Sequence, residues 1–125
     1  MKDKIETGRT GEEKAVEFLR KNGYSILERN FRNIFGEIDI VASHKGVVCF
    51  IEVRTRRGAS KHAEALGSIG FLKQRKLSRL AISFLKEKKW YDRKARFDVV
   101  SVSLAQQEDS IKLLKDAFCV TERYS

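Results

Sequence analysis

The sequence has no proline, only two cysteines, and no apolar run approaching the roughly 20 residues that a membrane-spanning helix needs. Without proline, no element boundary or kink can be assigned to that residue. Two cysteines in 125 residues exclude a disulfide framework. Residues 1–10 are polar and carry no apolar signal-peptide core. We therefore expect a reduced, cytoplasmic setting and no association with a membrane.

Charge, in contrast, is abundant and unevenly distributed. Apolar residues make up 42% of the chain and charged residues 34%, which is a globular composition. The length suits one domain over residues 1–125 with a core at about 9–118. The net charge is +9, yet the segment from Arg54 to Arg96 holds 14 basic and 3 acidic residues, a net charge of +11. Such a basic surface favours a nucleic-acid partner, and solubility alone is the alternative.

Hydrophobic periodicity predicts two helices and five strands. Thr10 and Glu13 form a capping-box pattern at the start of the first helix, and Gly23 predicts its end. The expected elements are a helix at residues 11–22, strands at 24–30, 38–42 and 47–53, a basic loop at 54–70, a helix at 71–88, and strands at 97–104 and 111–118. This order predicts an α/β fold with a central mixed sheet flanked by helices.

Two carboxylates stand in a strand pair that is otherwise almost continuously apolar. If the turn centres near residues 44 and 45, Asp39 lies opposite residues 50–52, and its carboxylate and that of Glu52 converge. Converging carboxylates repel one another, and either a raised pKa or a hard cation such as Mg²⁺ relieves the repulsion. The alternative is that both lie at strand ends and form ion pairs with Arg54 or Arg56.

The order of short motifs resembles that of a nuclease superfamily. Gly36–Asp39 followed by Phe50–Arg56 resembles the PD-(D/E)XK core of restriction endonucleases and Holliday-junction resolvases, an α-β-β-β-α-β unit that matches the predicted order. More narrowly, the chain resembles the YraN-like family of small bacterial proteins assigned as endonucleases. The motifs that carry this resemblance are Arg9–Glu12, Gly23–Tyr24, Asn30–Arg32, Glu37–Asp39, Glu52–Arg54, Lys73–Arg75 and Arg96–Val100.

The resemblance implies a metal site. It assigns Asp39, Glu52 and the main-chain carbonyl of Val53 as ligands of Mg²⁺ or Mn²⁺, a cation that polarises a phosphoryl group and activates water. Arg54 stands where the superfamily has lysine. Because a guanidinium stays protonated, Arg54 can hydrogen-bond the scissile phosphate but cannot act as a base.

A second residue could supply the missing lysine. Lys73 lies four residues before Leu77 and extends the buried stripe of the second predicted helix toward the sheet. The alternative is a lysine at a helix start whose ammonium extends into solvent.

Two further acidic residues are implied to assist. Glu12 matches an acidic residue that faces the site in resolvase-like proteins, and it falls on the predicted inward stripe of the first helix. Its alternative is a capping-region glutamate that interacts with the helix dipole. Glu37 is close in sequence to Asp39, and its alternative is an ion pair with Arg32 or Arg96.

The expected function is that of a metal-dependent endonuclease acting on branched or structured DNA. The residues expected to contact the DNA backbone are Arg56, Arg57 and Lys61 in the basic loop and Lys73, Arg75, Lys76 and Arg79 on the second helix. The alternatives are a catalytically inactive nucleic-acid-binding module on the same fold and an interaction protein whose basic face docks an acidic partner. Since a branched substrate needs two symmetry-related cuts, the resemblance also suggests a homodimer.

Overall fold

A computed structural model describes residues 2–58, 62, 69–105 and 107–118. Within these ranges the elements follow one another in the predicted order. The helices are α1 (Lys2–Lys21) and α3 (Phe71–Lys88), and the strands are β1 (Ser25–Asn33), β2 (Gly36–His44), β3 (Val47–Arg57), β4 (Ala95–Leu104) and β5 (Ser110–Leu114).

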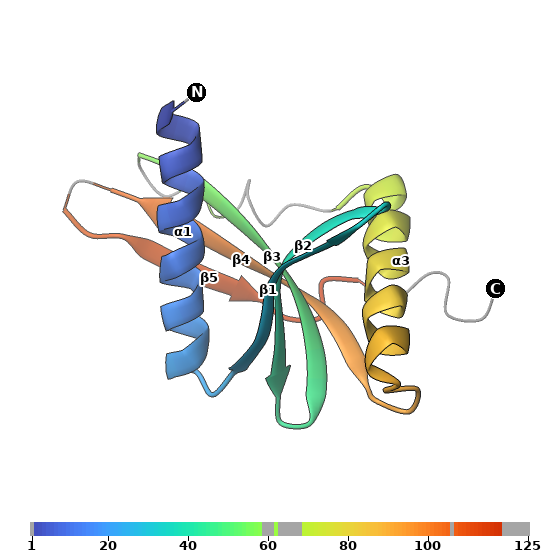
Figure 1. The fold of residues 1–125 in the computed structure, drawn as a ribbon. Coiled ribbons are helices and arrows are strands. Elements are labelled where there is room, and N and C mark those ends of the chain that lie inside the picture. The colour runs from blue at the N-terminus through green and yellow to red at the C-terminus, as the bar shows by residue number, and fades with distance from the viewer. Residues whose placement is uncertain (1, 59–61, 63–68, 106, 119–125) are drawn as a thin grey trace.

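The five strands form one sheet in the order β1-β2-β3-β4-β5. Strands β3 and β4 are parallel, and the other neighbouring pairs are antiparallel. Helices α1 and α3 cover opposite faces of the sheet (Figure 1). The predicted α/β class with a central mixed sheet flanked by helices is therefore confirmed.

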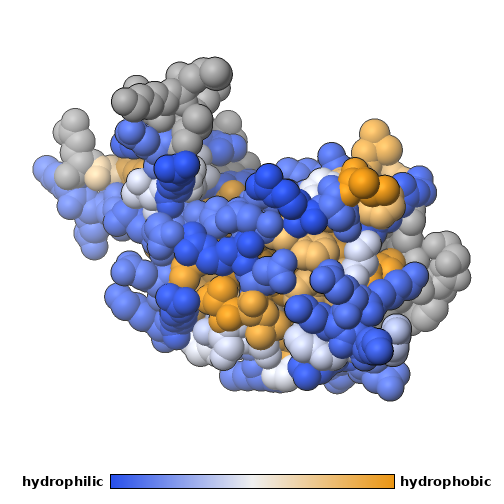
Figure 2. Space-filling view, in the orientation of Figure 1, coloured by the Kyte–Doolittle hydropathy of each residue, from blue (hydrophilic) through white to orange (hydrophobic). Residues whose placement is uncertain are grey.

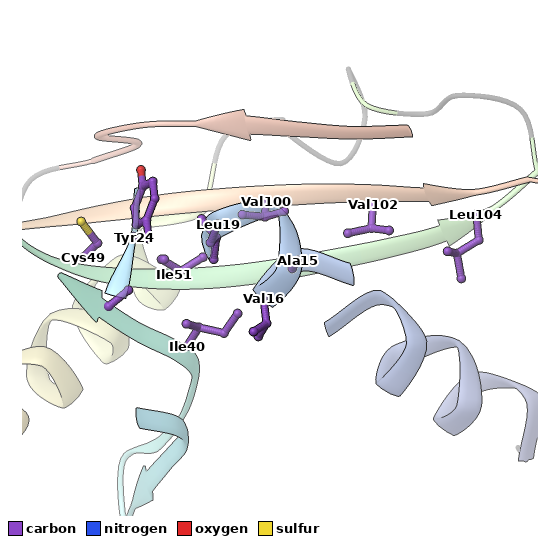
Figure 3. Close-up of a cluster of buried hydrophobic side chains, with 11 residues drawn as sticks. Ala15, Val16, Leu19, Tyr24, Ile40, Cys49, Ile51, Val100, Val102 and Leu104 are labelled. Atoms are coloured by element: carbon purple, nitrogen blue, oxygen red, sulfur yellow. The ribbon is translucent and has the colours of Figure 1, made fainter. Parts of the chain in front are cut away.

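The alternation of side chains along β3 supplies two separate cores. Ile51 belongs to the core beneath α1, together with Ala15 and Leu19 of that helix (Figure 3). Phe50 belongs to the core beneath α3, where its ring meets that of Phe84 edge to face with the centroids 5.7 Å apart. Because both faces are buried, any charged side chain in the middle of β2 or β3 needs a specific partner.

Helix α1 begins at Lys2, well before the predicted start near Gly11. Thr10 is consequently inside the helix, and the predicted capping box is wrong. Tertiary packing outweighs the weak helical preference of the glycines in this segment. In the part of α1 that precedes the predicted start, the Thr7 hydroxyl accepts a hydrogen bond of 2.6 Å from Arg57 Nε at the end of β3.

Strand β3 continues to Arg57, beyond the predicted end at Val53. Its pairing with β4 accounts for the extra length, because the parallel ladder continues as far as the Arg57–Leu104 pair. Arg54, Arg56 and Arg57 therefore lie on a strand and not in a loop, which corrects the sequence prediction for this part of the basic segment.

Helix α3 begins at Phe71 and ends at Lys88, as predicted. Its C-cap residue Lys89 adopts a left-handed conformation with φ of 61°, and the Trp90 amide donates a 2.9 Å hydrogen bond to the Leu85 carbonyl. Among the described residues, no helix combines the length and the apolar character that crossing a membrane requires.

The approach of α1 to β3 yields a stability prediction. A Cβ added at Gly11 would lie 1.9 Å from Thr55 Oγ1, whereas a Cβ at Gly8 would meet nothing within 4 Å. We expect Gly11→Ala to lower the free energy of unfolding by about 1–3 kcal/mol, because helix and strand must move apart. Gly8→Ala, the matched control, should raise it by up to about 1 kcal/mol. Urea denaturation measures both, and equal effects would contradict the close approach.

Candidate active site

Strands β2 and β3 separate partway along their length. Their pairing ends at Ile40–Ile51, while β3 continues alongside β4. One further pair in the same register would set Asp39 opposite Glu52, in agreement with the sequence prediction. Past the last pair, the Val53 amide donates a 2.8 Å hydrogen bond to Asp39 Oδ2. The Asp39 side chain thus accepts the bond that a strand carbonyl would otherwise take.

Strand β2 is distorted at Asp39. Ile38 belongs to the core beneath α3 and Ile40 to the core beneath α1, although strand residues two apart normally share a face. In β1, Asn30 lies between the residues that pair with Ile38 and Ile40, and it has a left-handed φ of 56°. The distortion leaves Asp39 between the two faces of the sheet.

The Asp39 carboxyl has a strongly perturbed pKa. This pKa is raised from its ordinary value of 3.8 to about 6. Burial is the largest cause, and the negative charges of Glu52, Glu12 and Glu37 add to it against the opposing effect of the Val53 amide. Glu12, Glu37 and Glu52, three of the four acidic residues predicted for the site, therefore all disfavour ionisation of Asp39. A cation placed among them would reverse this shift.

Glu52 faces the α3 side and lies between two cations. Its Oε1 forms an ion pair with Lys73 Nζ of α3, and its Oε2 lies 3.3 Å from Arg54 Nη2. Oε2 is buried and has no hydrogen-bond partner. The ion pair with Arg54, expected as the structural alternative, is present. Lys73 also reaches the carboxylate, although its side chain is half exposed.

Glu12 and Glu37 each form an ion pair with an arginine. Glu12 Oε1 lies 3.3 Å from Arg29 Nη2 and accepts a 3.3 Å hydrogen bond from Asn30 Nδ2. Because α1 begins at Lys2, Glu12 is in the middle of the helix, and its alternative role in the capping region is wrong. Glu37 Oε2 forms a 2.9 Å ion pair with Arg32, which was one of the two partners expected for it.

Two hollows meet at Asp39. One is lined by Glu37, Asp39 and Glu52 on the side of α3. The other is an open cleft of about 600 Å³ on the side of α1, and its lining residues include Glu12, Asp39, Arg56 and Arg57. A ligand in the cleft would therefore contact both the acidic cluster and the basic end of β3.

The donor set fits a hard divalent cation that keeps several waters. No group of three or more His, Cys, Asp or Glu side chains in the described ranges is arranged to hold a metal ion. Mg²⁺ typically takes only one or two carboxylates and completes its shell with water and phosphate oxygens. Asp39 and Glu52 supply two carboxylates. Oε2 of Glu52 is buried without a hydrogen-bond partner, so this oxygen atom could coordinate the cation.

The residues predicted to contact a nucleic-acid backbone form two groups. Arg56 and Arg57 line the cleft on the α1 side. On α3 lie Lys73, Arg75, Lys76 and Arg79. Lys61 lies outside the described residues. Lys73 differs from the others because its ammonium group contacts a carboxylate of the acidic cluster.

One buried polar network escaped the sequence analysis. Asp98 of β4 accepts hydrogen bonds from Tyr24 (3.2 Å) and from Arg96 Nε (3.1 Å), so Arg96 is a partner of Asp98 and not of Glu37. His44 stacks on the Tyr24 ring with the centroids 4.2 Å apart, and it is the last residue of β2, not a turn residue. Arg96 and Asp98 in the motif Arg96-Phe97-Asp98 could have indicated this network, because charged residues are rare in a buried strand.

Comparison with known proteins places this architecture in a family. The family model described as "Uncharacterised protein family UPF0102" matches residues 11–102, a range that contains the four carboxylates of the cluster. The chain belongs to the UPF0102 family.

Similar UPF0102 proteins align along nearly the whole chain. A UPF0102 protein of Caldicellulosiruptor saccharolyticus is 45% identical over 118 residues, covering 93% of this chain and 99% of the relative. A UPF0102 protein of Syntrophus aciditrophicus is 41% identical over 118 residues, covering 94% and 92%. A third, of Desulfosudis oleivorans, is 44% identical over 111 residues, covering 89% and 88%. These names state no reaction, so the chemistry of the site carries the functional argument.

The raised pKa of Asp39 makes stability depend on pH in a specific direction. The folded protein holds this proton more tightly than the unfolded chain, so its stabilising contribution is present below pH 4 and is lost as the pH rises through about 6. In EDTA, we expect the free energy of unfolding of the wild type to fall by about 3 kcal/mol relative to Asp39→Asn across that range. Urea denaturation at several pH values measures the difference.

The matched control for this experiment is Glu17→Gln, which removes an exposed carboxylate from α1. Its pH profile should follow that of the wild type. If Asp39→Asn also follows the wild type between pH 4 and 6, the Asp39 carboxyl does not have the perturbed pKa on which the description of the acidic cluster depends.

Proposed function

We propose that this UPF0102 protein is a metal-dependent endonuclease that hydrolyses phosphodiester bonds in DNA. The observation that carries the proposal is that Asp39 and Glu52 line one hollow at the point where β2 leaves β3. There one carboxyl has its pKa raised to about 6, and the other keeps a buried oxygen without a hydrogen bond. Buried carboxylates of like charge are costly unless a cation or a proton joins them.

Asp39, Glu52 and the Val53 carbonyl would hold Mg²⁺ or Mn²⁺. When bound, such a cation polarises the phosphoryl group and lowers the pKa of water at the site. The Val53 amide fixes the orientation of the Asp39 carboxylate through its hydrogen bond to Oδ2. Glu12 and Glu37 add negative charge nearby, which strengthens cation binding, and their ion pairs with arginines hold them in place.

Arg54 and Lys73 divide the work that one lysine performs in the superfamily that the chain resembles. Both form ion pairs with Glu52. A phosphate entering the site offers them a second anion. Arg54 then donates hydrogen bonds to the phosphate oxygens, and Lys73 places a compact charge beside the attacking water. Because Lys73 is half exposed, its side chain has room to turn from Glu52 to the phosphate.

A basic surface flanks the cluster on both sides. Arg56 and Arg57 line the cleft that contains Asp39, and α3 presents further cations beyond Lys73. Cations of this kind neutralise phosphates along a backbone without reading its sequence. The site therefore suits a substrate chosen by shape more than by base sequence.

One observation favours a second candidate, a nucleic-acid-binding module without catalysis. The ion pairs from Lys73 and Arg54 already neutralise Glu52. If these contacts persist when DNA binds, they compete with a metal ion for the carboxylate. The basic surface would then bind the backbone while the acidic cluster serves only to hold β3 and α3 together.

A cleavage assay with Mg²⁺ or Mn²⁺ tests the proposal. We expect Glu52→Gln to lower the rate by about a hundredfold or more, the scale of losing one preorganised electrostatic group. Glu87→Gln, an exposed position on α3, is the matched control and should cleave like the wild type. Lys73→Met should also slow cleavage, whereas Lys86→Met, an exposed lysine near the other end of α3, should not.

The same variants separate the two candidates. Salt-sensitive DNA binding without cleavage by the wild type would establish the binding module and refute the hydrolase. Cleavage that survives in Glu52→Gln would assign the chemistry to another site or to a contaminant. DNA affinity measured in EDTA should change little in Glu52→Gln, because that substitution removes a ligand of the cation and leaves the basic surface intact.

A further inference from the structure

Large apolar side chains stand exposed where the tip of the β1–β2 hairpin meets the start of α3. Ile34 is 93% exposed, Leu72 is 80% exposed and Phe71 is 64% exposed. Figure 2 shows apolar atoms gathered over this part of the molecule, surrounded by hydrophilic surface. Single exposed apolar residues are ordinary, but a group of three at one edge is a candidate binding surface. We call the group Ile34, Phe71 and Leu72 the apolar edge.

The apolar edge is held in a defined position. Ile34 and Phe35 form the two-residue turn between β1 and β2, and Asn33 Oδ1 accepts a 2.8 Å hydrogen bond from the Phe35 amide. The Arg79 guanidinium of α3 lies over the Phe35 ring, 5.8 Å from its centroid. The turn and the helix together line a groove formed by Ile34, Phe35, Leu72, Arg75, Lys76 and Arg79.

This groove adjoins the acidic cluster. Lys73, the residue after Leu72, contacts Glu52. One turn further along α3, Lys76 packs against Gly36, where an added Cβ would come within 2.8 Å of its Cε. Gly36 precedes Glu37, which lines the hollow shared with Asp39 and Glu52. Among the described residues, the groove and the proposed site of hydrolysis share no lining residue, but neighbouring residues of α3 and of the β1–β2 hairpin line the two of them.

The composition of the groove points to one class of ligand. Its charged lining residues, Arg75, Lys76 and Arg79, are all basic, and its other lining residues are apolar. Phosphate groups match the cations, and the faces of unpaired bases match the apolar side chains. A fully paired duplex buries its base faces in its own stack, so it could use only the cations. Apolar side chains that enter a base step unstack it and stabilise an opened structure.

We propose that the apolar edge binds unpaired bases at a fork or branch in DNA and so directs the neighbouring strand to the acidic cluster. This inference rests on the proposed function, since it names the structural class of substrate for the same site. Ile34 and Leu72 contact the first unpaired bases, and the cations of α3 contact their phosphates. Selection for structure then comes from the hairpin tip and the start of α3, away from the reacting carboxylates.

Binding measured in EDTA tests the proposal without any cleavage. Fluorescence anisotropy compares a forked DNA with a duplex that has the same number of phosphates. We expect the wild type to prefer the fork, and Ile34→Ser/Leu72→Ser to lose about tenfold in affinity for the fork and almost none for the duplex. A 2-aminopurine placed at the first unpaired position should change its fluorescence with the wild type and not with the double variant.

The matched control replaces two exposed leucines elsewhere on the sheet, Leu27→Ser/Leu114→Ser, and should keep the preference for the fork. Circular dichroism and thermal melting verify that all variants are folded. Equal binding of fork and duplex by the wild type would overturn the proposal. A preference for the fork that survives in Ile34→Ser/Leu72→Ser would also overturn it. If sedimentation shows that the wild type self-associates, and only this variant loses self-association while keeping the fork preference, the edge binds a second copy of the chain and the proposal is likewise overturned.

The outcome is separable from that of the proposed hydrolysis. Glu52→Gln should retain the preference for the fork, because Glu52 is not part of the apolar edge. Absence of cleavage by the wild type together with a fork preference that depends on Ile34 and Leu72 would refute the hydrolase and support this inference. Cleavage that depends on Glu52 but occurs equally on duplex and fork would support the hydrolase and refute this inference.

Discussion

The hydrogen bond from the Val53 amide to Asp39 Oδ2 stabilises the point at which β2 and β3 part. A strand amide in the middle of a sheet must find an acceptor, and past the Ile40–Ile51 pair the acceptor is a side chain in place of a backbone carbonyl. β3 is then free to continue beside β4, while β2 and β1 turn toward α3 (Figure 1). The position of the acidic cluster, the cleft beside α1 and the reach of the hairpin tip all depend on this separation.

The carboxylates of the cluster differ because each meets a different environment. Glu52 has two cations beside it, one from its own strand and one from α3. Asp39 is largely buried near other carboxylates, so its pKa rises to about 6 although the Val53 amide opposes the rise. A cation bound as proposed would replace a proton at one carboxyl and ion pairs at the other. The basic residues that neutralise Glu52 are the same groups that a phosphate would attract.

The sequence predicted what local patterns determine. The limits of α3 follow from a regular apolar stripe, and the convergence of Asp39 and Glu52 follows from the length of the turn between their strands. The start of α1 could not be predicted, because Thr10 and Gly11 carry the local features of a helix start while the contact of Gly11 with β3 joins distant parts of the chain. The contact between Lys73 and Glu52 is likewise tertiary, and the sequence did not predict it. The reaction itself stays a prediction.

The proposed function requires Asp39 and Glu52 to form one site for a divalent cation. Electron paramagnetic resonance of Mn²⁺ titrated into the protein without DNA tests it most directly, because bound and free Mn²⁺ give different spectra. We expect the wild type and Glu87→Gln to bind Mn²⁺, and Asp39→Asn and Glu52→Gln each to lose about tenfold or more in affinity. Binding that is unchanged in both of these variants would show that these carboxylates do not hold the cation.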